Sequence, residues 1–152
     1  MMPHTLIIGY GNPIRGDDGF GWHAAMRLQD LIHDKDIEIL AVHQLTPELM
    51  EPITRARRVI FIDAAVGEDP GTMTVATLET SSGPAPAFTH FATPVALLEG
   101  ARSLYGAKPE ALLITVVGLD FELSEQLSEP VRLALESLAG TKIRELIAGP
   151  LY

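Results

Sequence analysis

The chain contains an uninterrupted apolar run, Val59-Ile60-Phe61-Ile62, that ends on a carboxylate at Asp63. A short apolar run without polar interruption is typical of a strand that is buried on both faces of a parallel sheet. A charge that closes such a strand is desolvated unless it has a partner. The run therefore predicts a buried parallel strand and marks Asp63 as a candidate functional residue.

Predicted strands and helices alternate on both sides of this run. The further strands are expected at 5–9, 37–42, 73–78 and 111–117, and the helices at 18–32, 46–56, 94–105 and 128–147. Apolar residues at helical spacing indicate the helices, and a proline stands in the first turn of three of them. Gly140 is expected to weaken the last helix. We therefore predict an α/β fold of three layers, in which helices cover both faces of a mostly parallel, twisted sheet of five strands.

The composition narrows the classes of protein and partner. A length of 152 residues predicts a single domain over 1–152, and the net charge of −9 disfavours nucleic acid and anionic membranes as partners. The absence of cysteine excludes disulfides and thiolate metal sites. No apolar run approaches the roughly 20 residues of a membrane-spanning helix, and residues 1–4 carry no basic side chain. We expect a cytoplasmic monomer.

Three side chains are expected to meet at one edge of the predicted sheet. Asp18 follows the first strand, Asp63 closes the third, and His90 lies in the loop after the fourth. In open α/β sheets, ligands bind outside the carboxyl ends of the strands, where the strand order reverses. Two carboxylates and an imidazole could there hold nickel, zinc or iron with open coordination positions. They could equally activate a water without a metal, one carboxylate acting as general base.

Each of these residues also has a structural explanation. Asp17 or Asp18 could cap the first helix, because a carboxylate at a helix N-terminus accepts free amide protons. Either of the two could then be the functional acid. Asp63 could cap the turn that follows its strand, and a single loop histidine such as His90 is more often hydrogen-bonded than a ligand.

The glycines after the first strand offer a rival interpretation as a dinucleotide site. Gly9 and Gly11 stand between a strand and a helix, but Ile14 occupies the position of the third glycine of that fingerprint. Asp17 and Asp18 would moreover bring negative charge to the place where a pyrophosphate binds. A nucleotide-binding module of Rossmann or flavodoxin type therefore remains only an alternative.

Several motifs, in order along the chain, resemble one enzyme family. The run 9–21, GYGNPIRGDDGFG, is similar to the opening signature of the nickel-iron hydrogenase maturation endopeptidases. Phe61-Ile62-Asp63-Ala64 resembles the family's second aspartate motif, and Thr89-His90 with Thr93-Pro94 resembles its histidine segment. The histidine segment also includes Leu97-Leu98, and the resemblance continues through 104–106 and 117–122 to 127–128, so it covers essentially the whole chain.

The resemblance implies an activity, a partner and a set of roles. The family removes a C-terminal extension from the hydrogenase large-subunit precursor after nickel insertion, which makes that precursor the expected partner. The matching positions Asp18, Asp63 and His90 are then the nickel ligands and the catalytic residues, with nickel carried by the substrate. Some family members have Glu at the position of Asp18, so Asp17 could contribute instead. A non-catalytic nickel checkpoint protein with the same ligands is the second alternative.

Overall fold

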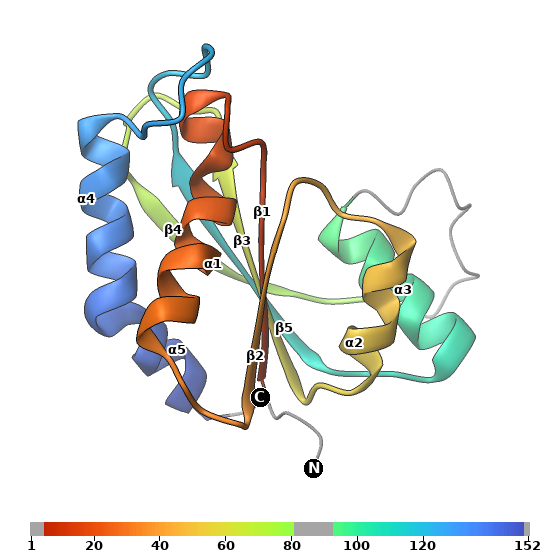
Figure 1. The fold of residues 1–152 in the computed structure, drawn as a ribbon. Helices are drawn as coiled ribbons and strands as arrows, with labels where there is room; N and C mark the ends of the chain where they lie inside the picture. Colours follow the sequence, from red (N-terminus) through yellow and green to blue (C-terminus); the bar gives the residue numbers. More distant parts are fainter. Residues whose placement is uncertain (1–4, 81–92, 151–152) are drawn as a thin grey trace.

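The computed structural model describes residues 5–80 and 93–150, which build a sheet between two layers of helices (Figure 1). The strands are β1 (Thr5–Tyr10), β2 (Ile37–Val42), β3 (Arg58–Ala65), β4 (Met73–Leu78) and β5 (Glu110–Val117). The α-helices are α1 (Phe20–Leu31), α2 (Met50–Thr54), α3 (Pro94–Tyr105), α4 (Glu129–Ser137) and α5 (Ile143–Ala148).

The strand order in the sheet is β2-β1-β3-β5-β4. All neighbouring strands are parallel except β4, which runs antiparallel to β5 at one edge. The apolar run at 59–62 lies in β3, at the centre of the sheet, with both faces covered. The predicted α/β class, the five strands and the mostly parallel sheet are confirmed.

The order of the strands reverses between β1 and β3. After β1 the chain adds β2 on one side, and the next strand, β3, pairs with the other side of β1. The loops that leave the carboxyl ends of β1 and β3 therefore start next to each other at this reversal. In this architecture such a point is where ligands bind.

The two faces of the sheet carry separate hydrophobic cores. One core combines Ile7, Ile60 and Ile62 of the strands with α1, α4 and α5. The other combines Leu6 and Phe61 with α2 and α3. Figure 1 shows α1, α4 and α5 on one side of the sheet and α2 and α3 on the other. Alternate residues of a strand point to opposite faces, so each position of β3 can be assigned to a face.

Glycines allow α1 to approach the sheet closely. A Cβ atom on Gly9 would overlap the carbonyl oxygen of Gly21, and one on Gly21 would overlap the carbonyl oxygen of Ile62. Helix and strand backbones are thus in direct contact, which fixes the start of α1 against the ends of β1 and β3. This contact gives a packing reason for glycine at the first and last positions of the run 9–21.

Three of the predicted helices differ in detail from the structure. The first begins with a 3₁₀ turn over Gly16–Gly19, so Asp18 lies in this turn and not in the α-helix. The second is a 3₁₀ turn, Pro47–Leu49, followed by the short α2. The last is interrupted by a π-helical segment, Leu138–Lys142, which contains Gly140 as the expected weak point. Within 5–80 and 93–150, no helix combines the length and hydropathy required to cross a bilayer.

A buried arginine holds the end of the last helix. The Arg58 guanidinium donates to the carbonyls of Leu146 at 2.7 Å, Ile147 at 3.0 Å and Pro150 at 2.7 Å. It also pairs with the Glu110 carboxylate at 3.3 Å, and both side chains are almost inaccessible to solvent. Arg58 thereby joins the start of β3 to the free carbonyls at the C-terminal end of α5.

Candidate functional site

Asp63 lies at the carboxyl end of β3, next to the point where the strand order reverses. It follows Phe61 by two positions in the strand, so its side chain points to the same face, which α2 and α3 cover. The residue is half-buried, and its Oδ1 accepts a hydrogen bond of 2.7 Å from the Ala64 N–H. Burial raises the pKa of the Asp63 carboxyl above its usual range, because the charged form loses hydration.

Tyr10 is the neighbour of Asp63 on β1. Gly9 pairs with Ile62, so the next residues along the two parallel strands, Tyr10 and Asp63, lie side by side. The Tyr10 hydroxyl donates to the Asp63 carboxylate, and this bond partly offsets the effect of burial on the pKa of Asp63. Burial raises the pKa of Tyr10 far above its usual range, and the adjacent carboxylate raises it further. Tyr10 is therefore a neutral donor that orients Asp63.

Asp18 reaches the same place from the 3₁₀ turn before α1. Its Oδ2 accepts a hydrogen bond of 3.1 Å from the N–H of Asn12. The negative charge of Asp18 contributes to the raised pKa of Asp63, which means that the two carboxylates are close enough to repel. A pair of carboxylates of this kind favours a cation or a shared proton between them.

Both carboxylate oxygens of the neighbouring acid, Asp17, accept hydrogen bonds within the fold. Its carboxylate is completely buried and accepts four hydrogen bonds of 2.6–3.0 Å from Leu119 N, Asp120 N, Ser128 N and Ser128 Oγ. Burial alone would raise the pKa of Asp17, but the bonds from Ser128, Leu119 and Asp120 outweigh it and hold that pKa below its usual range. Asp17 has no oxygen left for a metal or a water, so Asp18 is the acid available at the site.

The expectation that Asp17 or Asp18 caps the first helix is wrong. Gly19 stands at the N-cap of α1, where no side chain bonds to the first turn. Asp18 bonds instead to the loop after β1, and Asp17 joins that loop to the segment between β5 and α4. Helix capping by Thr93 is present at α3, where its Oγ1 accepts from Ala96 N at 3.2 Å.

The third predicted side chain, His90, lies outside the described residues. The chain is described again from Thr93, at the start of α3, on the face of the sheet to which Asp63 points. Within 5–80 and 93–150, no group of three His, Cys, Asp or Glu side chains could hold a metal ion. The described part of the chain thus brings together two of the three predicted residues, Asp18 and Asp63.

In the loop after β1, Gly11 and the Asn12 N–H make contacts within the protein. Gly11 has a φ of 147°, and a Cβ there would overlap the carbonyl oxygen of Asp18. Glycine at this position therefore allows the loop to contact the 3₁₀ turn that contains Asp18. A phosphate cradle needs backbone N–H groups directed at an open space, and here the Asn12 N–H is directed at the Asp18 carboxylate.

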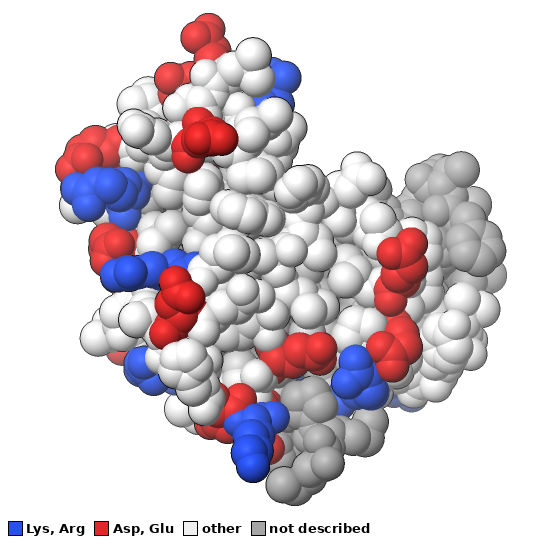
Figure 2. All heavy atoms as spheres, in the orientation of Figure 1, with Lys and Arg blue, Asp and Glu red and all other residues white. Residues whose placement is uncertain are grey.

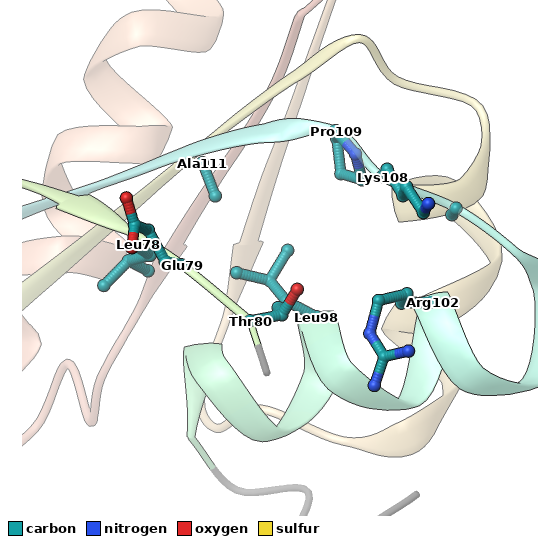
Figure 3. Close-up of a pocket in the computed structure, with 9 residues that line it drawn as sticks. Leu78, Glu79, Thr80, Leu98, Arg102, Lys108, Pro109 and Ala111 are labelled. Carbon is teal, nitrogen blue, oxygen red and sulfur yellow. The ribbon is translucent and has the colours of Figure 1, made fainter. Parts of the chain in front are cut away.

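A separate cavity of about 480 Å³ lies at the other end of the sheet, between the start of β5, the end of β4 and α3 (Figure 3). Leu78, Leu98 and Ala111 form part of its wall, and Arg102 and Lys108 stand at its side. Neither Asp18 nor Asp63 lines this cavity. It is therefore distinct from the acidic pair.

Comparison of the sequence with known proteins gives no match, whereas comparison of the structure does. No family model and no curated protein sequence matches the chain. A solved nickel-iron hydrogenase maturation protease, HycI from Thermococcus kodakarensis, is 28% identical, with 97% of this chain and 91% of that chain covered and a TM-score of 0.74. The chain is therefore similar in sequence and fold to a nickel-iron hydrogenase maturation protease over nearly its whole length.

Two further members show the same fold at lower identity. The hydrogenase maturating endopeptidase HybD from Escherichia coli is 23% identical, with 96% and 94% of the two chains covered and a TM-score of 0.71. A hydrogenase 2 maturation peptidase from a Thaumarchaeota archaeon is 22% identical, with 96% and 98% covered and a TM-score of 0.70. The resemblance predicted from the run 9–21 is confirmed, and the similarity to HycI supports an endopeptidase.

Sequence reasoning missed two side chains that position the acidic residues. Tyr10 became recognisable only through the register that sets it beside Asp63. Ser128 is the N-cap residue of α4, but its hydroxyl donates to Asp17 instead of capping the helix. No local pattern indicates a partner that is separated by 111 residues along the chain.

Replacement of Tyr10 by phenylalanine is expected to raise the pKa of Asp63 further. The variant loses the hydroxyl hydrogen bond that favours the ionised carboxylate, while burial and the Asp18 charge remain. The ¹³C shift of the Asp63 carboxyl, followed against pH in metal-free protein, measures the change. Tyr105→Phe is the matched control because Tyr105 is exposed on α3. An unchanged titration midpoint in Tyr10→Phe would contradict the contact.

Proposed function

We propose that this protease removes the C-terminal extension of a nickel-iron hydrogenase large-subunit precursor once nickel has been inserted. Asp18, Asp63 and His90 would bind the nickel that the precursor carries, so that the metal acts as a recognition element. The observation that carries this proposal is the pair of carboxylates, Asp18 and Asp63, at the reversal of strand order. The similarity to solved hydrogenase maturation proteases supports a hydrogenase precursor as the substrate.

The acidic pair would bind a cation that the substrate delivers. Burial disfavours the ionised form of Asp63, and the negative charge of Asp18 adds to this effect. A cation brought by the loaded precursor would favour the ionised form. Carboxylate oxygens and an imidazole are suitable ligands for nickel, and two or three of them leave coordination positions for the substrate's own ligands.

The hydrolysis itself requires a positioned water and a base. In the proposed reaction a carboxylate of the pair accepts a proton from water as the water oxygen attacks the scissile carbonyl carbon. The carbon–nitrogen bond then breaks, and the proton passes to the leaving amine. The products are a shortened precursor with a new carboxyl terminus and a free peptide.

Intact mass of the precursor tests this proposal directly. A purified, nickel-loaded large-subunit precursor is expected to lose a single C-terminal peptide on incubation with the protease, and the nickel-free precursor is expected to keep its mass. The expected selectivity follows from the proposed binding of the precursor's nickel by Asp18, Asp63 and His90. Equal cleavage of both forms would refute recognition through nickel, and stable binding without cleavage would favour a checkpoint role.

A further inference from the structure

Four large apolar side chains stand exposed on three loops that leave the carboxyl ends of β1, β3 and β5. Ile14 is 51% exposed, Val66 89%, Leu119 58% and Leu123 77%. Figure 1 shows these three loops gathered at the same end of the molecule, beyond the start of α1. Clustered exposed apolar residues mark interaction sites more often than isolated ones do. We call Ile14, Val66, Leu119 and Leu123 the apolar rim.

Backbone hydrogen bonds hold the three loops together. The loops after β1 and β5 are joined by Ser124 N to the Ile14 carbonyl at 3.0 Å and Gly16 N to the Ser124 carbonyl at 2.8 Å. The loops after β3 and β5 are joined by Gly118 N to the Ala65 carbonyl at 2.9 Å. The apolar rim is therefore carried on a fixed frame, and a partner need not order these loops when it binds.

The apolar rim adjoins the candidate site. Ile14 lies in the loop that leads to Asp18, and Val66 follows Asp63 by three residues in β3 and its loop. The buried carboxylate of Asp17 bonds to the Leu119 N–H, so the turn that carries Asp18 and the loop that carries Leu119 are directly connected. A macromolecule seated on the rim would lie beside the two carboxylates.

The charges around the apolar rim have one predominant sign. The three loops contain the exposed acids Glu68, Asp69, Asp120, Glu122 and Glu125. The single basic residue in them is Arg15. Figure 2 shows acidic side chains around uncharged surface at this end of the molecule. The surface thus combines an apolar centre with an acidic border, which fits a partner with exposed apolar residues bordered by Lys and Arg.

We propose that the apolar rim is the docking surface for the folded body of the polypeptide substrate, whose complementary face is apolar with a basic border. The inference rests on the proposed function, because it takes the hydrogenase large-subunit precursor as that substrate. Docking on the rim would deliver the precursor's metal and its scissile segment to Asp18 and Asp63. Affinity for the precursor would then depend on side chains that take no part in the hydrolysis.

The experiment compares two double variants of the full chain. Leu119→Gln with Leu123→Gln removes half of the apolar rim and leaves the Leu119 N–H free to bond to Asp17. Leu104→Gln with Leu133→Gln is the matched control, because these leucines are comparably exposed, at 54% and 55%, on α3 and α4. For each protein, the Kd for loaded precursor is measured by titration and the cleavage rate by intact mass, with thermal unfolding as the check on folding.

The rim variant is expected to bind the precursor at least about tenfold more weakly and to show a KM raised to the same extent, with kcat unchanged. The control is expected to match the parent protein. Equal affinity of all three proteins would overturn the docking surface while leaving the proposed function intact. Rim-dependent binding without cleavage by the parent would support docking and overturn the proposed function, and no binding by the parent would overturn both.

Discussion

Replacement of Asp63 by asparagine is expected to slow cleavage of the loaded precursor by about 10²- to 10⁴-fold. Asparagine keeps the shape of the side chain and can still accept from the Ala64 N–H. It cannot carry the negative charge that would bind a cation or take a proton from water. The rate of peptide release, measured by intact mass under single-turnover conditions, reports the loss.

The stability of Asp63→Asn separates a chemical effect from misfolding. The variant removes a half-buried charge that Asp18 repels, so its free energy of unfolding should equal or exceed that of the parent. Asp30→Asn is the matched control, because it makes the same change at an exposed position on α1. A rate within about threefold of the parent, in a folded Asp63→Asn protein, would remove Asp63 from the site.

Replacement of Asp17 by alanine is expected to lower the free energy of unfolding by at least about 3 kcal/mol. The substitution removes the acceptor of three backbone N–H groups in the segment between β5 and α4, those of Leu119, Asp120 and Ser128. Chemical denaturation at neutral pH measures the change. Asp34→Ala is the control, since Asp34 is exposed and its carboxylate accepts one hydrogen bond, from Asp36 N. Its replacement should cost less than about 1 kcal/mol.

The pH dependence of stability gives an independent test of how ionised Asp17 contributes to the free energy of unfolding. Its pKa is lowered in the folded state, so its ionised form stabilises the fold at pH values above the usual aspartate pKa of 3.8. This contribution is lost as the pH falls from that value through the lowered pKa. The unfolding free energy of Asp17→Ala should therefore depend less on pH in the acid range than that of the parent. Parallel pH curves would show that Asp17 does not contribute in this way.

Most of the fold follows from local patterns in the sequence. The apolar run at 59–62 needs two covered faces, and the alternation of strands and helices around it supplies them. The pattern could not show that the first helix starts with a 3₁₀ turn. That turn is held by hydrogen bonds from Gly16 N to the Ser124 carbonyl and from Asp17 N to the Asp120 carbonyl, both far away in the sequence.

The candidate site was only partly predictable for the same reason. Asp18 and Asp63 follow strands whose carboxyl ends meet, so their convergence could be inferred from strand order alone. The choice between Asp17 and Asp18 could not be inferred in this way. It depends on four hydrogen bonds to Asp17 from residues more than 100 positions away. His90 stays a prediction, supported by the family resemblance.

The hydrogen bonds from Arg58 to the end of α5 indicate where the protein can be labelled or immobilised. The guanidinium fixes the carbonyls of Leu146, Ile147 and Pro150 beside the start of β3, at the opposite end of that strand from Asp63. A fluorophore or surface linker attached at Pro150 would lie at the end of the sheet that is remote from both the apolar rim and the acidic pair. Binding kinetics measured on protein tethered there would report on an unobstructed substrate face.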